Sequence, residues 1–270
     1  MKKTVSYFRL AFAVCASLAA ILQILAVLIS YDVGTNYFRQ GAVLPILSVV
    51  FALLGAVCGT VAARMTDIET QNTTPFPKGI SPAPVSVGFL VTAVFLFVHG
   101  NTTLSLVTAA FMIVSAGYGI LTGIPTFQKS TIPVYLGIAA IVGYILLNAY
   151  YYFDVTVEMN APMKVMTQIG LLCAMVSLTG ELRYLLGKPM QRMFLTMSAW
   201  VVSIGALSAL SVPLAFFLGK TDRADYAAGG FLVCCAVLTS IVRIKTLLRA
   251  PTSEEPSEDD NTADSDETAE

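Results

Sequence analysis

Four uncharged polar side chains are the first candidates for chemistry in this sequence: Gln23, His99, Asn148 and Gln168. Each lies within or at the end of an apolar run long enough to cross a bilayer. A helix rises about 1.5 Å per residue, so the three amides fall about 6 to 9 Å below one membrane surface, with His99 at that surface. Amide and imidazole groups at one shallow depth predict a polar vestibule that opens to the outside.

A simpler interpretation of the same residues is structural. An amide near the membrane surface can bond to a neighbouring helix, which contributes roughly 0.6 to 2 kcal/mol per bond. Asn148 and Gln168 belong to consecutive antiparallel runs at similar depth, so we expect them to face each other. His99 is the only histidine and has no carboxylate or cysteine beside it, which favours a turn residue over a metal ligand or an acid-base catalyst. Of the two interpretations, the sequence favours the structural one.

The rest of the sequence has no arrangement of residues that is typical of catalysis or cofactor binding. Its apolar runs lack a central Asp, Glu, Lys or Arg, which argues against a proton pump or a voltage sensor. The five cysteines lie in apolar runs without CxxC spacing and are expected to pack as small apolar residues. P-loop, GxGxxG, HExxH and GxSxG motifs are missing as well. We therefore expect no metal, no cofactor and no enzyme activity.

Transmembrane helices are expected to position these side chains. Charged residues make up 12% of the chain and apolar residues 56%, and the mean hydropathy is +0.75, so lipid must cover most of the surface. Eight apolar runs predict an all-α integral membrane protein, a polytopic bundle with short loops. The runs are 10–29, 41–63, 85–100, 104–123, 132–152, 163–180, 193–218 and 226–242.

Some details of these runs bear on how the helices pack. The third run is short and follows a proline-rich loop, so a re-entrant hairpin formed with the fourth is an alternative to two crossings. The seventh contains Pro213, which removes a backbone hydrogen bond and is expected to kink the helix. Gly55 with Gly59 and Gly119 with Gly123 match the GxxxG pattern, for which packing within the bundle is favoured over dimerisation.

The distribution of basic residues predicts the orientation. With the N-terminus inside the cell, 12 of the 16 lysines and arginines fall in cytoplasmic segments, which matches the usual excess of basic residues there. The 4 on the outside are Arg39, Lys164, Lys220 and Arg223. The predicted location is the cell membrane, with both termini cytoplasmic.

Three cytoplasmic segments are candidates for contact with a partner. The loop 64–84 contains four prolines and is expected to be extended. The composition of residues 180–189 suits a short interfacial helix that touches a soluble protein, but anchoring of the chain at the membrane surface is the favoured explanation of the same charges. The tail 251–270 holds 9 of the 17 acidic residues and no basic residue, so it is expected to be disordered. The expected partners are the lipid bilayer and a protein at the cytoplasmic face; the pattern indicates no nucleic acid and no particular oligomeric state.

Three classes of function are consistent with this architecture. Many crossings, short loops, a proline-bent seventh helix and shallow polar residues favour a permease-like transporter or a transporter subunit. The alternative is a non-catalytic membrane scaffold or regulatory subunit that acts through its cytoplasmic loops and tail. An intramembrane enzyme comes last, because no cluster of carboxylate, histidine or serine side chains is expected to converge at one depth.

Labelling of a cysteine placed at Asn101 tests the third and fourth crossings. The turn 99–103 is expected to lie outside, so Asn101→Cys, in a background without the native cysteines, should react with an impermeant maleimide added to intact cells. Protection until the membrane is permeabilised would instead indicate a re-entrant hairpin and six crossings, with both termini still cytoplasmic.

Overall fold

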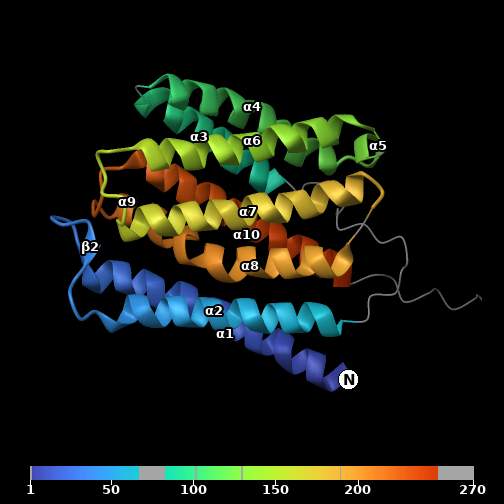
Figure 1. The fold of residues 1–270 in the computed structure, drawn as a ribbon, viewed down its shortest axis with the longest axis horizontal. Helices are drawn as coiled ribbons and strands as arrows, with labels where there is room; N and C mark the ends of the chain where they lie inside the picture. Colours follow the sequence, from blue (N-terminus) through green and yellow to red (C-terminus); the bar gives the residue numbers. More distant parts are fainter. Residues whose placement is uncertain (1, 67–82, 101, 129, 189, 249–270) are drawn as a thin grey trace, which may run out of the picture.

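The computed structural model describes residues 2–66, 83–100, 102–128, 130–188 and 190–248, which form an all-α membrane bundle (Figure 1). Within these residues, seven helical segments are long and apolar enough to cross a membrane, and an eighth apolar helix is shorter. The helices are α1 (Lys2–Ser30), α2 (Val43–Met65), α3 (Ala83–His99), α4 (Thr103–Thr122), α5 (Pro125–Gln128), α6 (Ile132–Phe153), α7 (Pro162–Leu185), α8 (Gln191–Ala209), α9 (Ser211–Phe217) and α10 (Ala224–Leu248). The short strands β1 (Tyr31–Asp32) and β2 (Tyr37–Phe38) pair antiparallel. The predicted tail 251–270 and most of the predicted loop 64–84 lie outside the described residues.

Successive long helices alternate in direction along the axis of the bundle (Figure 1). The start of α1 and the last turns of α10 lie at the same end, which we call the terminal end. The opposite end carries the β1–β2 hairpin and the connections α3–α4, α6–α7 and α9–α10, and we call it the hairpin end. This alternation agrees with the sequence of predicted runs, in which α8 and α9 together correspond to the seventh.

The last long helix lies at the centre of the bundle. α10 contacts α3, α7, α8 and α9, whereas α1 and α2 pack on each other and on α8, and α4 packs on α3 and α6. The buried core includes Phe89, Met112, Tyr144, Leu171 and Leu232, which come from five different helices. Large apolar side chains are exposed around the sides, as a surface in contact with lipid requires.

Small residues allow α2 to approach its neighbours closely. A Cβ on Gly59 would meet the Cβ of Ala199 in α8 at 2.6 Å and the ring of Phe12 in α1 at 3.0 Å. A Cβ on Gly55 would meet the Oγ of Ser203 at 2.7 Å. The first GxxxG pair therefore packs within the bundle, which confirms the interpretation favoured from the sequence.

The kink expected at Pro213 is present as a break between α8 and α9. α8 ends at Ala209 and α9 begins at Ser211, because the proline has no N–H to bond the carbonyl four residues earlier. The break packs on α10, where a Cβ on Gly230 would meet the Cδ of Pro213 at 2.8 Å. Close contact with the central helix thus holds the bend in place.

α3 and α4 pack against each other as antiparallel neighbours. Near the start of α3, Val85 lines a small cavity together with Arg243 of α10. Further along, the Thr92 hydroxyl donates to the carbonyl of Ala228 at 3.2 Å. At the end of α3, His99 lines a pocket beside the first turn of α10. α3 therefore follows α10 from one end to the other, as the interpretation with two crossings expects.

Two charged residues lie in the helices beyond the predicted runs. The runs end at 180 and 242, one residue short of Glu181 and Arg243, yet α7 continues to Leu185 and α10 to Leu248. Both charged side chains are buried and form an ion pair with each other. Both lie beyond the predicted runs, whose central parts carry no charge; two opposite charges that pair can enter a bundle together.

Residues 180–189 do not form the separate interfacial helix that their composition suits. Residues 180–185 are the last turns of α7, and the chain then turns at Gly187, whose φ is +69°. The N–H of Gly187 bonds to the carbonyl of Tyr184, and the N–H of Lys188 bonds to that of Arg183, which closes the helix end. Glu181, in this last part of α7, is buried and paired with Arg243 of α10.

One added methyl group at Gly59 should destabilise the bundle. Gly59→Ala brings a Cβ within 2.6 Å of Ala199, so α2 must move away from α8, at an expected cost of about 1 to 3 kcal/mol. Gly117→Ala is the matched control, because its Cβ would first meet the end of the Leu136 side chain, at 3.3 Å. Thermal unfolding in detergent should show a lower midpoint for the first variant only, and equal midpoints would contradict this packing.

Candidate functional site

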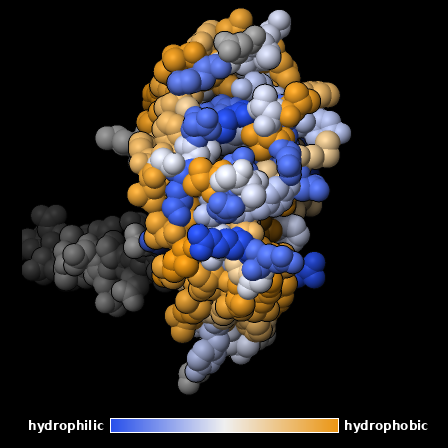
Figure 2. Space-filling view, turned by 90° about the vertical axis from the view of Figure 1, so that its left-hand side faces the viewer, coloured by the Kyte–Doolittle hydropathy of each residue, from blue (hydrophilic) through white to orange (hydrophobic). Residues whose placement is uncertain are grey.

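A pocket of about 560 Å³ opens at the hairpin end. It lies where α3 joins α4, where α6 leads to α7 and where α10 begins. Viewed from this end, hydrophilic residues gather over the middle of the molecule and hydrophobic residues surround them (Figure 2). The charged and aromatic residues that line the pocket are His99, Tyr150, Phe153, Asp154, Asp222, Arg223 and Asp225.

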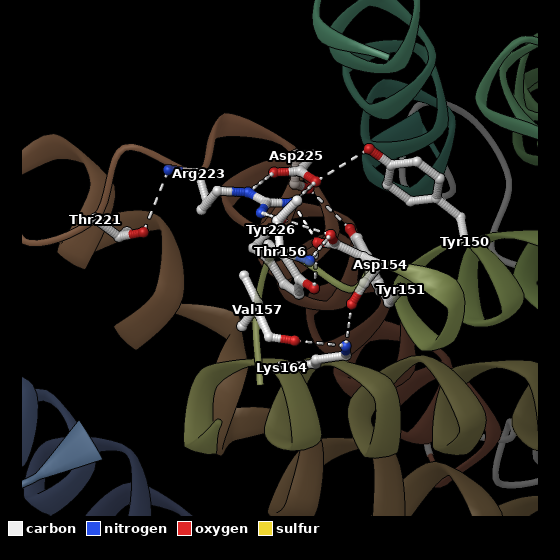
Figure 3. A network of polar contacts seen from close by, with 10 residues as sticks. All are labelled: Tyr150, Tyr151, Asp154, Thr156, Val157, Lys164, Thr221, Arg223, Asp225 and Tyr226. Carbon is white, nitrogen blue, oxygen red and sulfur yellow. Dashed lines mark hydrogen bonds and ion pairs between the residues drawn. The ribbon is translucent and has the colours of Figure 1, made fainter. Parts of the chain in front are cut away.

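An ion network centred on Arg223 forms one wall of the pocket (Figure 3). The guanidinium forms ion pairs with Asp154, which follows α6, and with Asp225, in the first turn of α10. Nη2 lies 2.8 Å from Oδ2 of Asp225, and Nε donates to Oδ1 of the same residue at 3.0 Å. Nη1 donates to the hydroxyl of Thr156. The aspartate side chains are 9% and 8% exposed, so both carboxylates are largely removed from water.

Three tyrosines supply further donors to the two aspartates (Figure 3). Tyr150 donates its hydroxyl to the Asp225 carboxylate at 3.2 Å, and Tyr226 donates to Asp154 at 3.0 Å. Tyr151 donates to the backbone carbonyl of Asp225 at 2.8 Å, and its ring stacks on that of Tyr226 with the centroids 4.6 Å apart. Both carboxylates therefore have hydrogen-bond donors besides the guanidinium, as buried charge requires.

Asp154 and Arg223 both keep their charges at neutral pH. Burial alone would raise the pKa of Asp154, but hydrogen bonds from Thr156 and the charge of Arg223 outweigh burial and hold that pKa below its usual value. Burial would likewise lower the pKa of Arg223, whereas the bonds and charges of Asp225 and Asp154 raise that pKa above its usual value. Asp154 and Arg223 thus form a fixed ion pair over the physiological pH range.

The local sequence explains why these residues meet. α6 ends at Phe153, and the next residue, Asp154, accepts from the N–H and the hydroxyl of Thr156 in a turn that aspartate favours. Asp225 lies in the first turn of α10, where the helix dipole favours a carboxylate. Lys164, in the first turn of α7, donates to the carbonyl of Asp154 at 2.8 Å. Three helix ends therefore converge at one point.

The structure places Gln23 away from the pocket. Gln23 is buried where α1, α2 and α7 meet. Its Oε1 accepts from the hydroxyl of Ser48 at 2.6 Å, and its Nε2 lies 3.1 Å from the Sδ of Met166. These contacts join three helices, so the role of this amide in the structure is packing between helices.

The other three vestibule residues are divided between two places. Gln168 Nε2 donates to the backbone carbonyl of Asn148 at 3.4 Å, while Asn148 Nδ2 donates to the carbonyl of Tyr144 in its own helix at 3.0 Å. His99 lines the pocket, and its ring stacks on Phe95 with the centroids 5.6 Å apart. The four residues therefore do not line one common pocket. Gln23 and Gln168 contact neighbouring helices, Asn148 bonds within its own helix, and His99 borders the pocket.

Sequence reasoning missed the residues that build the pocket. It treated Arg223 as one of four outside cations, gave Asp154 and Asp225 no role, and expected no carboxylate cluster at one depth, which is wrong at the hairpin end. A signal was available, because residues 220–225 hold four charges of both signs beside the predicted start of the last helix. Such a density of charge next to a membrane surface indicates an ion network, although the partner loop cannot be identified from spacing.

A second buried ion pair lies towards the other end of α10. Arg243 pairs with Glu181 of α7, whose carboxylate also accepts from the Tyr118 hydroxyl of α4 at 2.9 Å. A cavity of about 20 Å³ beside this pair is lined in part by Ser177 and Thr239. Residues 225–243 of α10 separate the two charge clusters, which corresponds to about 27 Å at the rise of a helix. The two clusters are therefore about as far apart as the two faces of a membrane hydrocarbon layer.

Comparison with known proteins gives no relative for this chain. No family model, no curated protein and no solved structure matches it.

Removal of the central cation should destabilise the folded protein. Arg223→Leu leaves two largely buried carboxylates without their counter-charge, and the expected loss in the free energy of unfolding is about 2 to 4 kcal/mol. Arg39→Leu is the control, since Arg39 is an exposed cation at the same end. Thermal unfolding in detergent compares the two variants. Equal effects would mean that the network stabilises the protein no more than a surface charge does.

Proposed function

We propose that the protein is a permease-like transporter, or the membrane-embedded binding subunit of one, and that its ligand binds in the pocket at the hairpin end. The pocket itself carries the proposal: a space of about 560 Å³ bounded by three helix ends and by charged side chains that a buried network fixes. Small ligands occupy pockets of roughly 300 to 1,000 Å³. In this proposal the protein binds and moves its ligand without changing it chemically.

The proposal includes an orientation, with the hairpin end outside the cell and both termini cytoplasmic. Three of the four basic residues at the hairpin end bind to other groups of the protein. Lys164 and Lys220 donate to backbone carbonyls, and Arg223 pairs with two aspartates. The charge of Arg223 is thus balanced by carboxylates within the protein and does not count against the excess of basic residues expected on the cytoplasmic side. Exposed basic residues at the terminal end include Arg9, Arg64, Arg183, Lys188, Arg192 and Lys245.

Polar groups along α10 support a route between the two ends of the bundle. The hydroxyl of Thr92 contacts α10 below the pocket, and the buried side chains of Thr239 and Ser240 lie further along that helix. The pair of Glu181 with Arg243 follows. A central helix with a charge cluster towards each end and hydroxyl groups between them suits a carrier whose two ends open alternately.

A membrane scaffold or regulatory subunit is the second candidate. The surroundings of Gln23 favour a scaffold, because this amide bonds to Ser48 and lies against Met166 instead of facing a water-filled space. In that case the partner would be a protein that binds at the terminal end, where exposed basic residues gather.

A panel of small solutes tests the transporter proposal. Purified protein in detergent is heated with amines, amino acids, sugars, nucleosides or carboxylates. A solute that binds the pocket should raise the unfolding temperature, since binding stabilises the folded state by roughly 2.7 kcal/mol at a hundredfold excess over the dissociation constant. Leu104→Trp, which puts a bulky ring into the lining of the pocket and obstructs ligand binding there, should abolish this shift. Leu106→Trp, exposed on the same helix and outside the pocket lining, should preserve it.

Uptake of the stabilising solute into proteoliposomes then distinguishes transport from binding alone. Saturable uptake that Leu104→Trp abolishes and Leu106→Trp retains is the expected result. If no solute class shifts the unfolding temperature and a soluble protein co-purifies in stoichiometric amount, the scaffold is the better explanation.

A further inference from the structure

We infer that the pocket at the hairpin end takes a monovalent organic cation, a substituted ammonium group in chemical terms. The inference rests on the proposed function of the pocket as a ligand site and names the class of that ligand. Three observations carry it: the net charge at the pocket, the hydrogen bonds that already occupy Arg223, and the accessible carboxylate and aromatic rings of the lining.

The charged side chains at the pocket leave an excess of one negative charge. Asp154, Asp222 and Asp225 line the pocket and carry −3 in total. Arg223 in the lining and Lys164, which bonds to the carbonyl of Asp154, carry +2 in total. The sum is −1, so one monovalent cation in the pocket would restore neutrality. A singly charged anion would instead raise the excess to −2.

Arg223 has little capacity left to bind an anionic ligand. A guanidinium has five N–H donors. Four hydrogen bonds from this one go to two aspartates and a threonine hydroxyl. The start of α4 also borders the pocket, and a capping box of Thr102 and Ser105 closes that helix end. The donors nearest the pocket are therefore largely in use, and an anion would have to displace existing bonds.

Asp222 is the carboxylate that a ligand can reach. Its residue is exposed, and the ion pairs found among the described residues do not include it. Tyr150 and Phe153 add aromatic rings to the same lining, and Phe153 is 67% exposed. A cation next to a carboxylate and a ring face is attracted by both. The accessible groups of the pocket thus favour positive charge with an organic surface.

The size and the ligands of the pocket favour an organic cation over a metal ion. Hard metal ions require several oxygen ligands close around them. In the part of the chain that the structure describes, no group of three or more His, Cys, Asp or Glu side chains is placed to hold a metal ion. A space of about 560 Å³ is the size of a small organic molecule's site.

Three probes of similar shape and different charge test the inference. Choline is a cation, 3,3-dimethylbutan-1-ol is its uncharged carbon analogue, and 3,3-dimethylbutanoate is an anion of similar bulk. In maltoside detergent, which has no ammonium group, choline is expected to bind about tenfold more tightly than the other two by calorimetry. Added sodium chloride should weaken choline binding, because salt screens exposed carboxylates, and should leave binding of the alcohol unchanged.

Two variants connect choline binding to the pocket. Asp222→Asn removes the accessible carboxylate and should weaken choline binding about five- to tenfold, with little change in the unfolding temperature of the protein without ligand. Glu158→Gln is the matched control. Glu158 is an exposed carboxylate of the hairpin end that accepts from Tyr37 and is not part of the lining, so choline affinity should stay the same.

The possible results distinguish two cases: the ligand is not a cation, or the pocket is not a ligand site at all. Binding of the alcohol or the butanoate as tightly as choline would overturn the cation class and leave the pocket as a ligand site. Failure of all three probes to bind would also overturn it. In either case the wider solute panel reports independently whether the pocket binds another class of ligand.

An ammonium group could reach the pocket as a free solute or as the headgroup of a lipid. Repeating the choline titration in phosphatidylcholine nanodiscs distinguishes these sources. Weaker choline binding there than in maltoside indicates that headgroups compete for the pocket, and unchanged binding indicates a free solute. Both results support a cationic ligand, and loss of the Asp222→Asn effect in both media would contradict it.

Discussion

Charge that is buried in a membrane bundle must be paired within the protein, because lipid supplies neither water nor counter-ions. The central helix α10 meets this requirement twice. At the hairpin end, Arg223 and Asp225 join Asp154 from the end of α6. Towards the terminal end, Arg243 joins Glu181 of α7. These pairs connect α10 to the end of α6 and to α7 at two levels, and α3, α8 and α9 pack on the same helix.

Features that depend on local properties could be predicted from the sequence. Lipid imposes a minimum length on each crossing, so apolar runs identified the helices. Pro213 marked a bend because its missing N–H acts on its own helix. Gly59 marked a close helix contact because only a residue without a side chain allows one. The predicted ends of α7 and α10 lie too early in the sequence, because each predicted run stops at its first charged residue. Both helices continue past that residue because Glu181 and Arg243 pair with each other, and such a contact between distant residues cannot be recognised from either helix alone.

The candidate site could not be predicted in the same way. Depth in the membrane follows from position along a helix, but the direction of a side chain depends on the rotation of that helix in the bundle. Gln23 was placed at a plausible depth, yet it faces Ser48 and a neighbouring helix. Arg223 and Asp154 are 69 positions apart, and each resembles an ordinary loop charge in isolation. Only the fold brings the end of α6 to the start of α10.

The contact between Lys220 and the end of α1 has a consequence for biosynthesis. Its ammonium group donates to the carbonyls of Val27 and Leu28, which are 193 and 192 positions earlier in the chain. At about 5 to 20 residues per second, a ribosome needs about 10 to 40 s to make the intervening chain. During this interval the carbonyls at the end of α1 have to be hydrated or bonded elsewhere. α1 therefore acquires these hydrogen bonds only after the loop between α9 and α10 has been made.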